Sequence, residues 1–493
     1  MTVPRTKLGT GVPGFDAIAR GGLPRGRFAL LSGGRGTGKT TFALQFLAAG
    51  IAAGDGGAVF VTFDETPDAL GRSALDLGLD LELWRAEGRW AFVDAVPDPA
   101  HETVFAGDFD LGGLLARIEA AVAASRAARV VLDSIDGLMV QVPRREVVQH
   151  ELRRLAQALA SMGVTTVATT TGAITAGDTA AVAPVQAIAD TVVRIERHAG
   201  PDDWPLTIEI VAMRGAAHLA GAYPVAVVPG EGLGVLAPPA FETEAQPPDR
   251  APTGNPGLDR MLGGGIFADT LILLQGPPGS GKSLLAMEFL AGGAGSGAKG
   301  VLVSFSESRS RIVADAAGWA IDIERMEADR RLAIVCARPD VASFADHLFL
   351  IDTVLDRFAP RRLVVEGLAA HARLIGPRVF VRGVAHLAAS LRQRGIAGLL
   401  TWPTALDGTM SPLDRDLATF ADAIVALDVG GDRDDPVRTI AVAKMRGSRH
   451  DQAARAYTIV GDGFHIGRSW READALATAL ADQPEHVGAG DEG

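Results

Sequence analysis

The chain has 493 residues, more than one hydrophobic core usually supports, and it is acidic, with 47 Lys and Arg against 59 Asp and Glu. The net charge of −12 argues against nucleic-acid binding, because proteins that bind phosphate backbones usually present a basic surface. No apolar run approaches the roughly 20 residues of a membrane-spanning helix, the first residues are polar, and a single cysteine, Cys336, excludes intramolecular disulfides and multi-cysteine zinc sites. We therefore expect a cytoplasmic protein of several domains without membrane contact.

The chain contains an internal duplication. The segment that begins at Thr10 aligns with the one that begins at Thr253, and this offset of 243 residues (253 − 10) holds without a gap beyond Lys39. Later matches such as Met213 with Met445 are 232 residues apart (445 − 213), so the second copy is about eleven residues shorter. A period of this length indicates two whole domains. We predict a first domain at 1–237, a linker rich in Pro and acidic residues at 238–252, a second domain at 253–475 and a short polar tail at 476–493.

In the first copy, short apolar runs alternate with longer stretches rich in Ala and Leu. The short runs are typical of strands buried on both faces, and the longer stretches are typical of helices. The alternation predicts an α/β fold with a mostly parallel sheet and helices on both faces. The expected strands are 28–31, 58–63 and 130–132, and the expected helices are 42–53 and 114–124.

Each copy carries a phosphate-binding loop directly after a predicted strand. Residues 33–40 and 276–283 both fit the pattern GxxxxGK[ST]. The glycines let backbone N–H groups surround phosphates at a helix N-terminus, and the lysine reaches the β and γ phosphates. The hydroxyl that follows completes the Mg²⁺ shell, so we predict ATP and Mg²⁺ as cofactors. The predicted nucleotide-binding residues are Gly36, Thr37, Gly38, Lys39, Thr40 and Thr41 in the first copy, and Gly279, Ser280, Gly281, Lys282, Ser283 and Leu284 in the second.

A carboxylate at the end of a neighbouring strand is expected to hold the metal. Asp133 ends such a run in the first copy, and Glu366 takes its place in the second. The extra methylene of Glu366 matters at a nearly octahedral ion, and an acid after an apolar run can also simply begin a loop. The predicted metal ligands are Thr40 and Asp133 in the first copy, and Ser283 and Glu366 in the second.

A second acidic site follows another predicted strand. Asp64 and Glu65 follow Phe63 in the first copy, and Ser306 and Glu307 occupy the equivalent places in the second. A carboxylate at a strand's carboxyl end is well placed to take a proton from water or from a hydroxyl. The alternative is a solvated turn. We predict Asp64, Glu65 and Glu307 as catalytic residues.

The paired phosphate-binding loops, the run from Phe63 to Pro67, the segment from Ala441 to Asp451 and the duplication together resemble the KaiC family of circadian-clock ATPases, over roughly residues 5–475. The resemblance implies two tandem RecA-like P-loop domains that assemble into an ATP-bound double-ring homohexamer. It also implies slow ATP hydrolysis and binding of the partner KaiB in the first domain, and serine/threonine autokinase activity in the second.

The resemblance further implies contacts that cross a subunit interface. Lys444 and Arg446 match the family's trans-acting pair, whereas in the first copy only Arg214 matches, because Ala212 replaces the lysine. Such a cation can contribute about 10³ to 10⁵ in rate in related enzymes. Trp319, which could instead be a core aromatic, matches an adenine-stacking residue. The other implied nucleotide contacts are His218, Arg438, Met445, Gly447 and Ser448.

The second copy departs from the family pattern at its catalytic positions. Ser306 stands where the family has a catalytic Glu, and Ala418 replaces one member of the phosphorylation pair. Thr419 is therefore the only predicted phosphorylation site. The C-terminal tail after Trp470 is short and unlike the family's, so a KaiA-like partner is not expected, while a KaiB-like partner is possible.

Two other functions fit parts of the sequence. A RecA- or RadA-type DNA recombination ATPase would share the fold, but the RadA-type zinc module needs four cysteines, and the acidic charge also counts against DNA binding. A non-catalytic scaffold that binds ATP for assembly is compatible with Ala212, Ser306 and Glu366. The sequence alone does not identify partners or output, reveal whether the protein oscillates, or decide which copy dominates hydrolysis.

Overall fold

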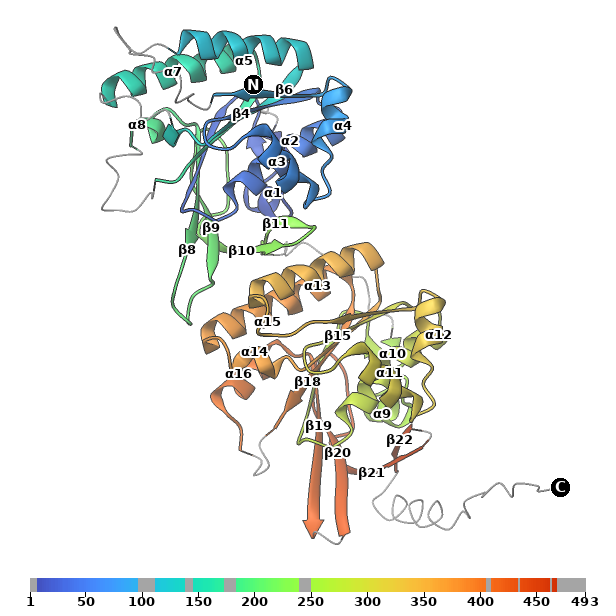
Figure 1. The fold of residues 1–493 in the computed structure, drawn as a ribbon. Helices are drawn as coiled ribbons and strands as arrows, with labels where there is room; N and C mark the ends of the chain where they lie inside the picture. Colours follow the sequence, from blue (N-terminus) through green and yellow to red (C-terminus); the bar gives the residue numbers. More distant parts are fainter. Residues whose placement is uncertain are drawn as a thin grey trace, which may run out of the picture. The chain divides into compact units, whose positions relative to one another are not determined.

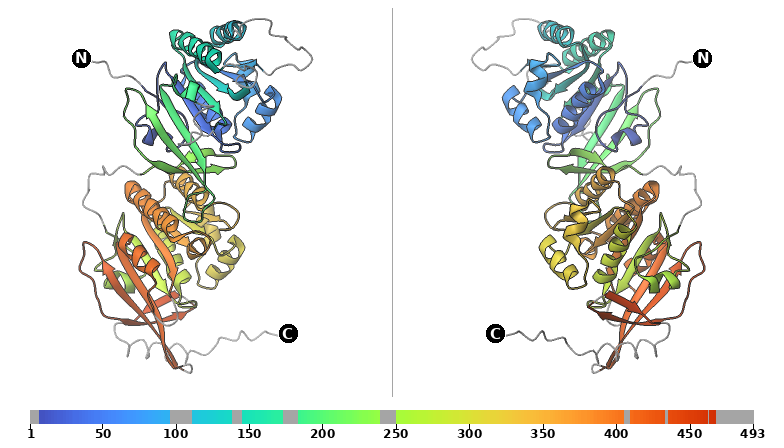
Figure 2. Two further views of the ribbon diagram at one scale, coloured as in Figure 1. Left: turned by 90° about the vertical axis from the view of Figure 1, so that its left-hand side faces the viewer. Right: turned by 90° about the vertical axis from the view of Figure 1, so that its right-hand side faces the viewer.

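The computed structural model describes residues 7–95, 111–137, 145–172, 183–238, 250–404, 409–432, 435–461 and 463–467. The chain divides into two compact units, Met1–Pro238 and Pro239–Gly493. Each unit contains a nine-stranded sheet with helices on both faces (Figures 1 and 2). The predicted α/β fold in two copies is thereby confirmed.

The first unit contains short strands near its start and then the elements of the main sheet. Its strands are β1 (Lys7–Leu8), β2 (Leu23–Pro24), β3 (Phe28–Gly33), β4 (Gly57–Thr62), β5 (Trp90–Asp94), β6 (Ala127–Asp133), β7 (Thr165–Thr170), β8 (Thr191–Arg197), β9 (Leu206–Met213), β10 (Ala222–Val228) and β11 (Gly232–Val235). Its helices are α1 (Phe15–Ile18), α2 (Lys39–Ala53), α3 (Pro67–Leu75), α4 (Leu81–Ala86), α5 (Gly112–Ser125), α7 (Arg145–Ser161) and α8 (Ala183–Gln186).

The second unit repeats this succession. Its strands are β12 (Arg250–Ala251), β13 (Ile266–Phe267), β14 (Leu271–Gly276), β15 (Gly300–Ser304), β16 (Leu332–Cys336), β17 (Arg362–Glu366), β18 (Ala397–Pro403), β19 (Ala423–Asp432), β20 (Asp435–Met445), β21 (Arg455–Val460) and β22 (Gly463–Ile466). Its helices are α9 (Pro256–Met261), α10 (Lys282–Gly295), α11 (Arg309–Ala317), α12 (Ile323–Ala328), α13 (Phe344–Phe358), α14 (Ala369–Ala372), α15 (Pro377–Arg394) and α16 (Pro412–Phe420).

The strand order places each phosphate-binding loop at the centre of its sheet. The first sheet has the order β11-β10-β9-β8-β3-β7-β6-β4-β5, and the second has the same order in its own elements, β22-β21-β20-β19-β14-β18-β17-β15-β16. The central strand β3 pairs in parallel with β7 and β8, and β14 pairs in parallel with β18 and β19. Since parallel strands end at the same edge, the loops that follow β3, β4 and β6 meet there.

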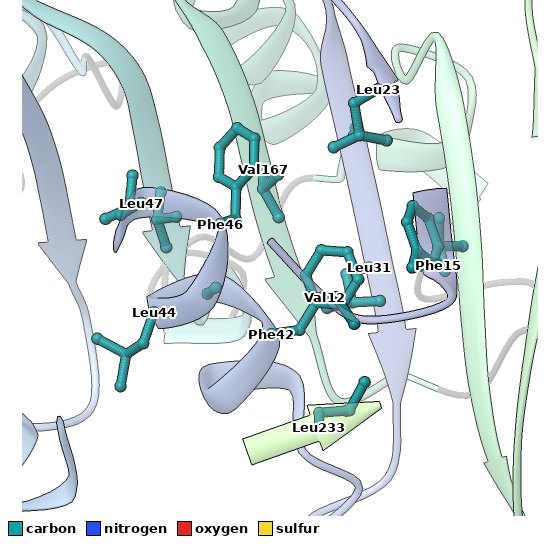
Figure 3. Close-up of a cluster of buried hydrophobic side chains, with 14 of the residues drawn as sticks. Val12, Phe15, Leu23, Leu31, Phe42, Leu44, Phe46, Leu47, Val167 and Leu233 are labelled. Atoms are coloured by element: carbon teal, nitrogen blue, oxygen red, sulfur yellow. The ribbon is translucent and has the colours of Figure 1, made fainter. Parts of the chain in front are cut away.

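Alternating side chains of β3 build a hydrophobic core on each face of the first sheet. Leu31 belongs to the cluster beneath α2, together with Phe42 and Phe46, which point from the helix toward the sheet (Figure 3). Phe28 and Leu30 belong to the opposite cluster, which the helices α5 and α7 cover. Burial on both faces explains why these strands are continuous apolar runs rather than alternating ones.

Several boundaries differ from the sequence prediction. The helix predicted at 42–53 begins at Lys39, because the phosphate-binding loop runs directly into the helix, and the strand predicted at 130–132 extends over Ala127–Asp133. The residues Arg250 and Ala251, predicted as linker, form β12 and pair with β13. The tail at 476–493 lies outside the described residues. Within those residues, no helix is long and apolar enough to cross a membrane.

A buried arginine occupies the same place in each unit. Arg129 lies on β6 and is 2% exposed, donates to the carbonyls of Gly9 (2.7 Å) and Phe46 (2.8 Å), and forms an ion pair with Asp55 at 2.8 Å. Its guanidinium lies over the Phe46 ring. The arginine therefore ties the chain's first segment to α2 and β6.

The second unit repeats the contact without the ion pair. Arg362 begins β17, donates to the carbonyls of Phe289 and Pro252, and lies over the Phe289 ring. Burial lowers the pKa of Arg362 to about 10, with Asp259 acting in the opposite direction. Ala298 stands 243 residues after Asp55, so the acidic partner is missing at that position.

Candidate functional site

The first phosphate-binding loop connects β3 to α2. Gly36 and Gly38 adopt left-handed conformations, with φ values of 70° and 88°, which a side chain would strain. The Lys39 side chain is buried, and its Nζ donates to the carbonyl oxygens of Gly33 (2.7 Å) and Gly34 (2.8 Å). Burial is the main cause that lowers the pKa of Lys39. The lysine thus spans its own loop, where a phosphate would replace these carbonyls as its partner.

The acid at the end of β6 meets the first turn of α2. Thr40 Oγ1 donates to Asp133 Oδ2 at 2.9 Å, and Thr169 at the end of β7 donates to the other carboxylate oxygen. Burial raises the pKa of Asp133, while the hydrogen bonds from Thr169 and Thr40 oppose the rise. A hydroxyl and a carboxylate in contact are the hard oxygen donors that Mg²⁺ accepts. This pair therefore fits a divalent ion bound with the phosphates.

Asp64 and Glu65 lie in the turn after β4, beside the end of β6. The backbone N–H of Phe63 donates to the carbonyl of Asp133 at 2.9 Å, which brings the two strand ends together. Thr62 Oγ1 accepts from the N–H of Glu65 (3.1 Å) and donates to its carbonyl (2.5 Å), so the turn is fixed. Partial burial, then the charges of Asp133 and Asp64, raises the pKa of Glu65.

The second phosphate-binding loop reproduces the first in its backbone. Gly279 and Gly281 have φ values of 77° and 89°, and Lys282 Nζ donates to the carbonyls of Gly276 (2.8 Å) and Pro277 (2.7 Å). Burial lowers the pKa of Lys282, as it does for Lys39. The two loops are therefore equivalent in how the glycines and the lysine are held.

The second acid is a longer side chain at the same place in the sheet. Glu366 ends β17, is 4% exposed and accepts a hydrogen bond from Ser283. Burial raises the pKa of Glu366 to about 7, with the charge of Glu307 adding to the rise. Glu366 can still hold an ion with Ser283, but a large part of it carries a proton at neutral pH when no cation is bound.

The acidic turn of the second unit is packed against a glycine. The N–H groups of Ser306 (3.4 Å) and Glu307 (3.0 Å) donate to Ser304 Oγ, and both side chains are exposed. A Cβ at Gly367, whose φ is 74°, would come within 2.9 Å of the Ser306 side chain. A side chain at Gly367, where the first copy has Ser134, would therefore collide with Ser306.

Two buried histidines lie behind this turn. The His371 and His347 rings are 4.9 Å apart, and the Phe305 ring lies 4.6 Å from the first and 5.1 Å from the second. His371 Nε2 and His347 Nδ1 have no hydrogen-bond partner in the described structure. Burial, then the neighbouring His347, lowers the pKa of His371 to about 4.

The implied trans-acting pair contacts the end of α16 in its own chain. Lys444 Nζ donates to the carbonyls of Ala418 (2.7 Å) and Ala421 (2.8 Å), and Arg446 Nη2 donates to the carbonyl of Thr419 (2.9 Å). Cations at a helix C-terminus are favourable because the last carbonyls carry partial negative charge. Burial, then the neighbouring Arg446, lowers the pKa of Lys444.

Thr419 is exposed, and Lys444 and Arg446 contact its own backbone carbonyl or those of neighbouring residues. Thr419 Oγ1 donates to the carbonyl of Asp416 at 2.6 Å. Arg446 also lies 3.5 Å from Asp422 but keeps 53% of its side chain exposed. The predicted phosphorylation site and the predicted trans-acting arginine consequently share one surface.

The remaining predicted contacts are distributed over both units. Arg214 follows β9 and is exposed, and His218 Nδ1 lies 3.1 Å from the carbonyl of Leu219. Trp319 is half-buried and packs against the core of the second unit, and Leu284 is buried in that core. The other predicted residues are Thr41 in the first turn of α2, Arg438 on β20 opposite Val429, Met445 at the buried end of β20, Gly447 in the turn after it, and Ser448, which accepts from Arg250.

Sequence reasoning missed several polar residues that only the fold brings to the site. Asp136 accepts hydrogen bonds from Thr170 (2.7 Å) and from the N–H of Thr171 (2.6 Å), which fix the segment after Asp133. Burial opposes them, yet together with Ser134 these bonds lower the pKa of Asp136. The signal available in the sequence was that Asp136 follows Asp133 by three residues, just after the same predicted strand.

Arg197 was missed for a different reason. It lies on β8, distant in sequence, and its Nη2 donates to the carbonyl of Gly36 in the phosphate-binding loop at 2.9 Å. Arg197 pairs across the sheet with Leu206, and the equivalent pair in the second unit is Val429 with Arg438. The arginine of this cross-strand pair therefore stands on β8 in the first unit and on β20 in the second.

The comparisons with known proteins agree with this geometry. The chain matches the family model described as "ATPase: KaiC" over residues 8–240 and 251–470. It is 37% identical over 472 residues to the circadian clock protein KaiC3 of Synechocystis sp., which covers 95% of this chain and 93% of that protein. It is 36% identical over 472 residues to the circadian clock oscillator protein KaiC of Thermostichus vulcanus, covering 95% and 90% of the two chains. The chain therefore belongs to the KaiC family of ATPases.

Proposed function

We propose that the protein is a slow, Mg²⁺-dependent ATPase that assembles as a homohexamer and acts in circadian-type timing or signalling. The observation that carries the ATPase proposal is the first-unit site, where Lys39, the Thr40–Asp133 pair and the turn of Asp64 and Glu65 converge at one edge of the sheet. The relatives named for the circadian clock support the timing role. The cytoplasmic location expected from the sequence remains a prediction.

In this proposal each first-unit residue has a separate task. The loop N–H groups and Lys39 bind the phosphates, and Thr40 and Asp133 hold the metal ion. When bound, Mg²⁺ would neutralise charge on the β and γ phosphates. Glu65, assisted by Asp64, orients the attacking water and accepts its proton. A raised pKa suits Glu65 to this task, because a base works best when its pKa approaches the working pH.

The second unit is proposed to phosphorylate Thr419. The support is that the phosphate-binding loop is intact and that Lys444 and Arg446 lie against the helix end that carries Thr419. Phosphoryl transfer depends mainly on positioning and charge neutralisation, so Glu307 can substitute for a base at Ser306. Of the two positions of the family's phosphorylation pair, Ala418 has no hydroxyl, so each subunit can carry at most one phosphate there, on Thr419.

Assembly is proposed to place ATP between subunits. Arg214 and Arg446 are both largely exposed, so each can reach a neighbour's nucleotide. Binding of ATP at such an interface stabilises the assembly by mass action. A KaiB-like partner is compatible with this proposal. Light scattering of micromolar protein should give a hexamer with ATP, and a monomer at saturating ATP would contradict the assembly.

Phosphate release from Mg-ATP tests the ATPase proposal against its alternatives. Slow release that single-stranded DNA does not stimulate is expected. Stimulation by DNA would favour the recombination ATPase. If ATP bound but no phosphate were released, the non-catalytic scaffold would be favoured. For the second unit this is the stronger alternative, because Ser306 is not an acid and the pKa of Glu366 is raised.

Intact-mass measurement after incubation with Mg-ATP tests the autokinase proposal. The expected result is one added phosphate that is absent from Thr419→Ala. Wild type and variant that both gain the phosphate would place the modification elsewhere. Wild type without added mass would leave an ATPase that has lost the kinase step.

A further inference from the structure

A tyrosine of the C-terminal strands contacts the second phosphate-binding loop. Tyr457 lies on β21, is 2% exposed, and its hydroxyl donates to the carbonyl oxygen of Ser280 at 2.6 Å. Its ring stacks on Phe464 of β22, with centroids 4.2 Å apart and an angle of 18°. Burial raises the pKa of Tyr457 to about 12, so the hydroxyl keeps its proton and remains a donor at neutral pH. The contact is therefore a fixed hydrogen bond inside the fold.

This bond fixes the orientation of one peptide of the loop. The carbonyl of Ser280 and the N–H of Gly281 belong to the same planar trans peptide, so they point in opposite directions. A carbonyl held toward Tyr457 therefore directs the N–H of Gly281 away from that side chain. Backbone N–H groups of this motif are the groups that surround phosphate.

The β21–β22 hairpin also leaves the loop little room to rearrange. A Cβ built on Gly281 would lie 2.5 Å from Ile459 Cδ1 and 3.2 Å from Phe464. The loop backbone at Gly281 therefore lies directly against the hairpin. The hydrogen bond and the packing together restrict the Ser280–Gly281 peptide to one orientation before any nucleotide binds.

The first unit has the same packing without the hydroxyl. Val225 pairs with Val235 across β10 and β11, as Tyr457 pairs with Ile466 across β21 and β22. A Cβ on Gly38 would lie 2.8 Å from Leu233, which shows that this hairpin also covers its loop. Val225 has no side-chain donor, so the bond from Tyr457 is specific to the second unit.

We propose that Tyr457 is a positioning residue that presets the second phosphate-binding loop for phosphate and thereby sets the ATP affinity of the second site independently of the first. This inference rests on the proposed binding of ATP at both sites. Loss of one buried hydrogen bond is typically equivalent to a two- to tenfold change in an equilibrium constant. Loss of the Tyr457 hydroxyl should weaken the binding of ligands that carry phosphates and should not change the binding of adenosine.

The test measures the Kd of a slowly hydrolysed fluorescent ATP analogue for variants in which only one of the two sites can bind it. In full-length Lys39→Ala, which leaves the second site, adding Tyr457→Phe should raise the Kd of the analogue about threefold to tenfold and leave that of adenosine unchanged. In Lys282→Ala, which leaves the first site, Tyr457→Phe should change the Kd by less than twofold. Tyr223→Phe is the matched control, because its exposed hydroxyl donates only to the carbonyl of Ala220.

The outcomes separate this inference from the function on which it rests. An unchanged Kd in the Lys39→Ala background would overturn the role of Tyr457 while leaving ATP binding intact. Equal weakening of ATP analogue and adenosine, or a fall in the melting temperature that accounts for the loss, would show a structural role instead and also overturn it. Absence of binding by Lys39→Ala itself would overturn nucleotide binding at the second site, and the inference with it.

Discussion

The two units share a strand order and a phosphate-binding loop, but they differ in the groups that surround the phosphates. The first unit places Asp133, Asp64 and Glu65 at one edge and fixes the following segment through Asp136. The second has the longer Glu366, whose pKa is about 7, and an uncharged Ser306. The duplication has therefore preserved the phosphate-binding loop and the glutamate of the acidic turn, whereas the acid at the metal position and the first residue of the acidic turn differ. The comparison predicts that the two sites bind nucleotide in the same way but hydrolyse it at different rates.

The largest expected difference between the units is in hydrolysis. Replacing the first-unit acids with amides, Glu65→Gln with Asp64→Asn, should lower steady-state phosphate release about 10²- to 10⁴-fold, which is the usual contribution of a positioned base. Glu307→Gln should leave most of the release intact. The measurement is phosphate release at saturating Mg-ATP, with assembly checked by light scattering. If Glu307→Gln lost more activity than the first-unit pair, the assignment of hydrolysis to the first unit would be reversed.

The buried arginines should differ in how much each stabilises its unit. Arg129→Met is expected to lower the free energy of unfolding of the first unit by about 4 kcal/mol, because two carbonyls lose their partner and Asp55 keeps only the more distant Arg25, at 3.6 Å. Arg362→Met should lower that of the second unit by about 2 kcal/mol, because only carbonyls lose a partner.

Calorimetry of the full chain measures both arginine variants, with the transition of the unaltered unit as the internal control. Equal losses in the two variants would contradict the contribution assigned to Asp55.

Acid should destabilise the second unit through His371. Its pKa is about 4 in the folded unit and near 6.5 when unfolded, so the unfolded chain binds the proton more tightly. The stability that neutral His371 provides is complete above pH 6.5 and is lost as the pH falls from 6.5 to 4, by up to about 3 kcal/mol.

In His371→Leu, the second unit should lose about 3 kcal/mol less stability than wild type between pH 7 and pH 4. The measurement is the melting temperature of the second unit at each pH, which should fall less in the variant. The first-unit transition of the same variant serves as the reference. A pH profile of the second unit that matches wild type would show that the histidine does not account for the acid sensitivity.

The smallest expected effect concerns the cation that contacts the first phosphate-binding loop. Arg197 is exposed, and its bond to the carbonyl of Gly36 competes with water. Arg197→Gln should therefore weaken ATP binding at the first site only about twofold to threefold. Titration in the Lys282→Ala background measures it, and the matched control is Arg194→Gln, because Arg194 forms ion pairs with Glu209 and Glu196. A loss above tenfold would indicate that Arg197 contacts the nucleotide itself.

Much of the fold and part of the site could be predicted because the signals are local. The glycine and lysine spacing of the loops, the apolar runs that precede them and the offset between Thr10 and Thr253 are all contained in short segments. They were sufficient for the tandem α/β fold and the KaiC family. The acids after β4 and β6 were also predictable as neighbours, because parallel strands end at one edge.

Only the tertiary structure decided which distant side chains complete each loop. Tyr457 lies 177 residues from Ser280, and Arg197 lies 161 residues from Gly36, so no local pattern connects them. The antiparallel strands β8 to β11 and β19 to β22 bring them together, and their register determines which residue faces the loop. The same holds for Glu366, since the sequence gives the carboxylate, whereas burial, a property of the folded unit, raises its pKa.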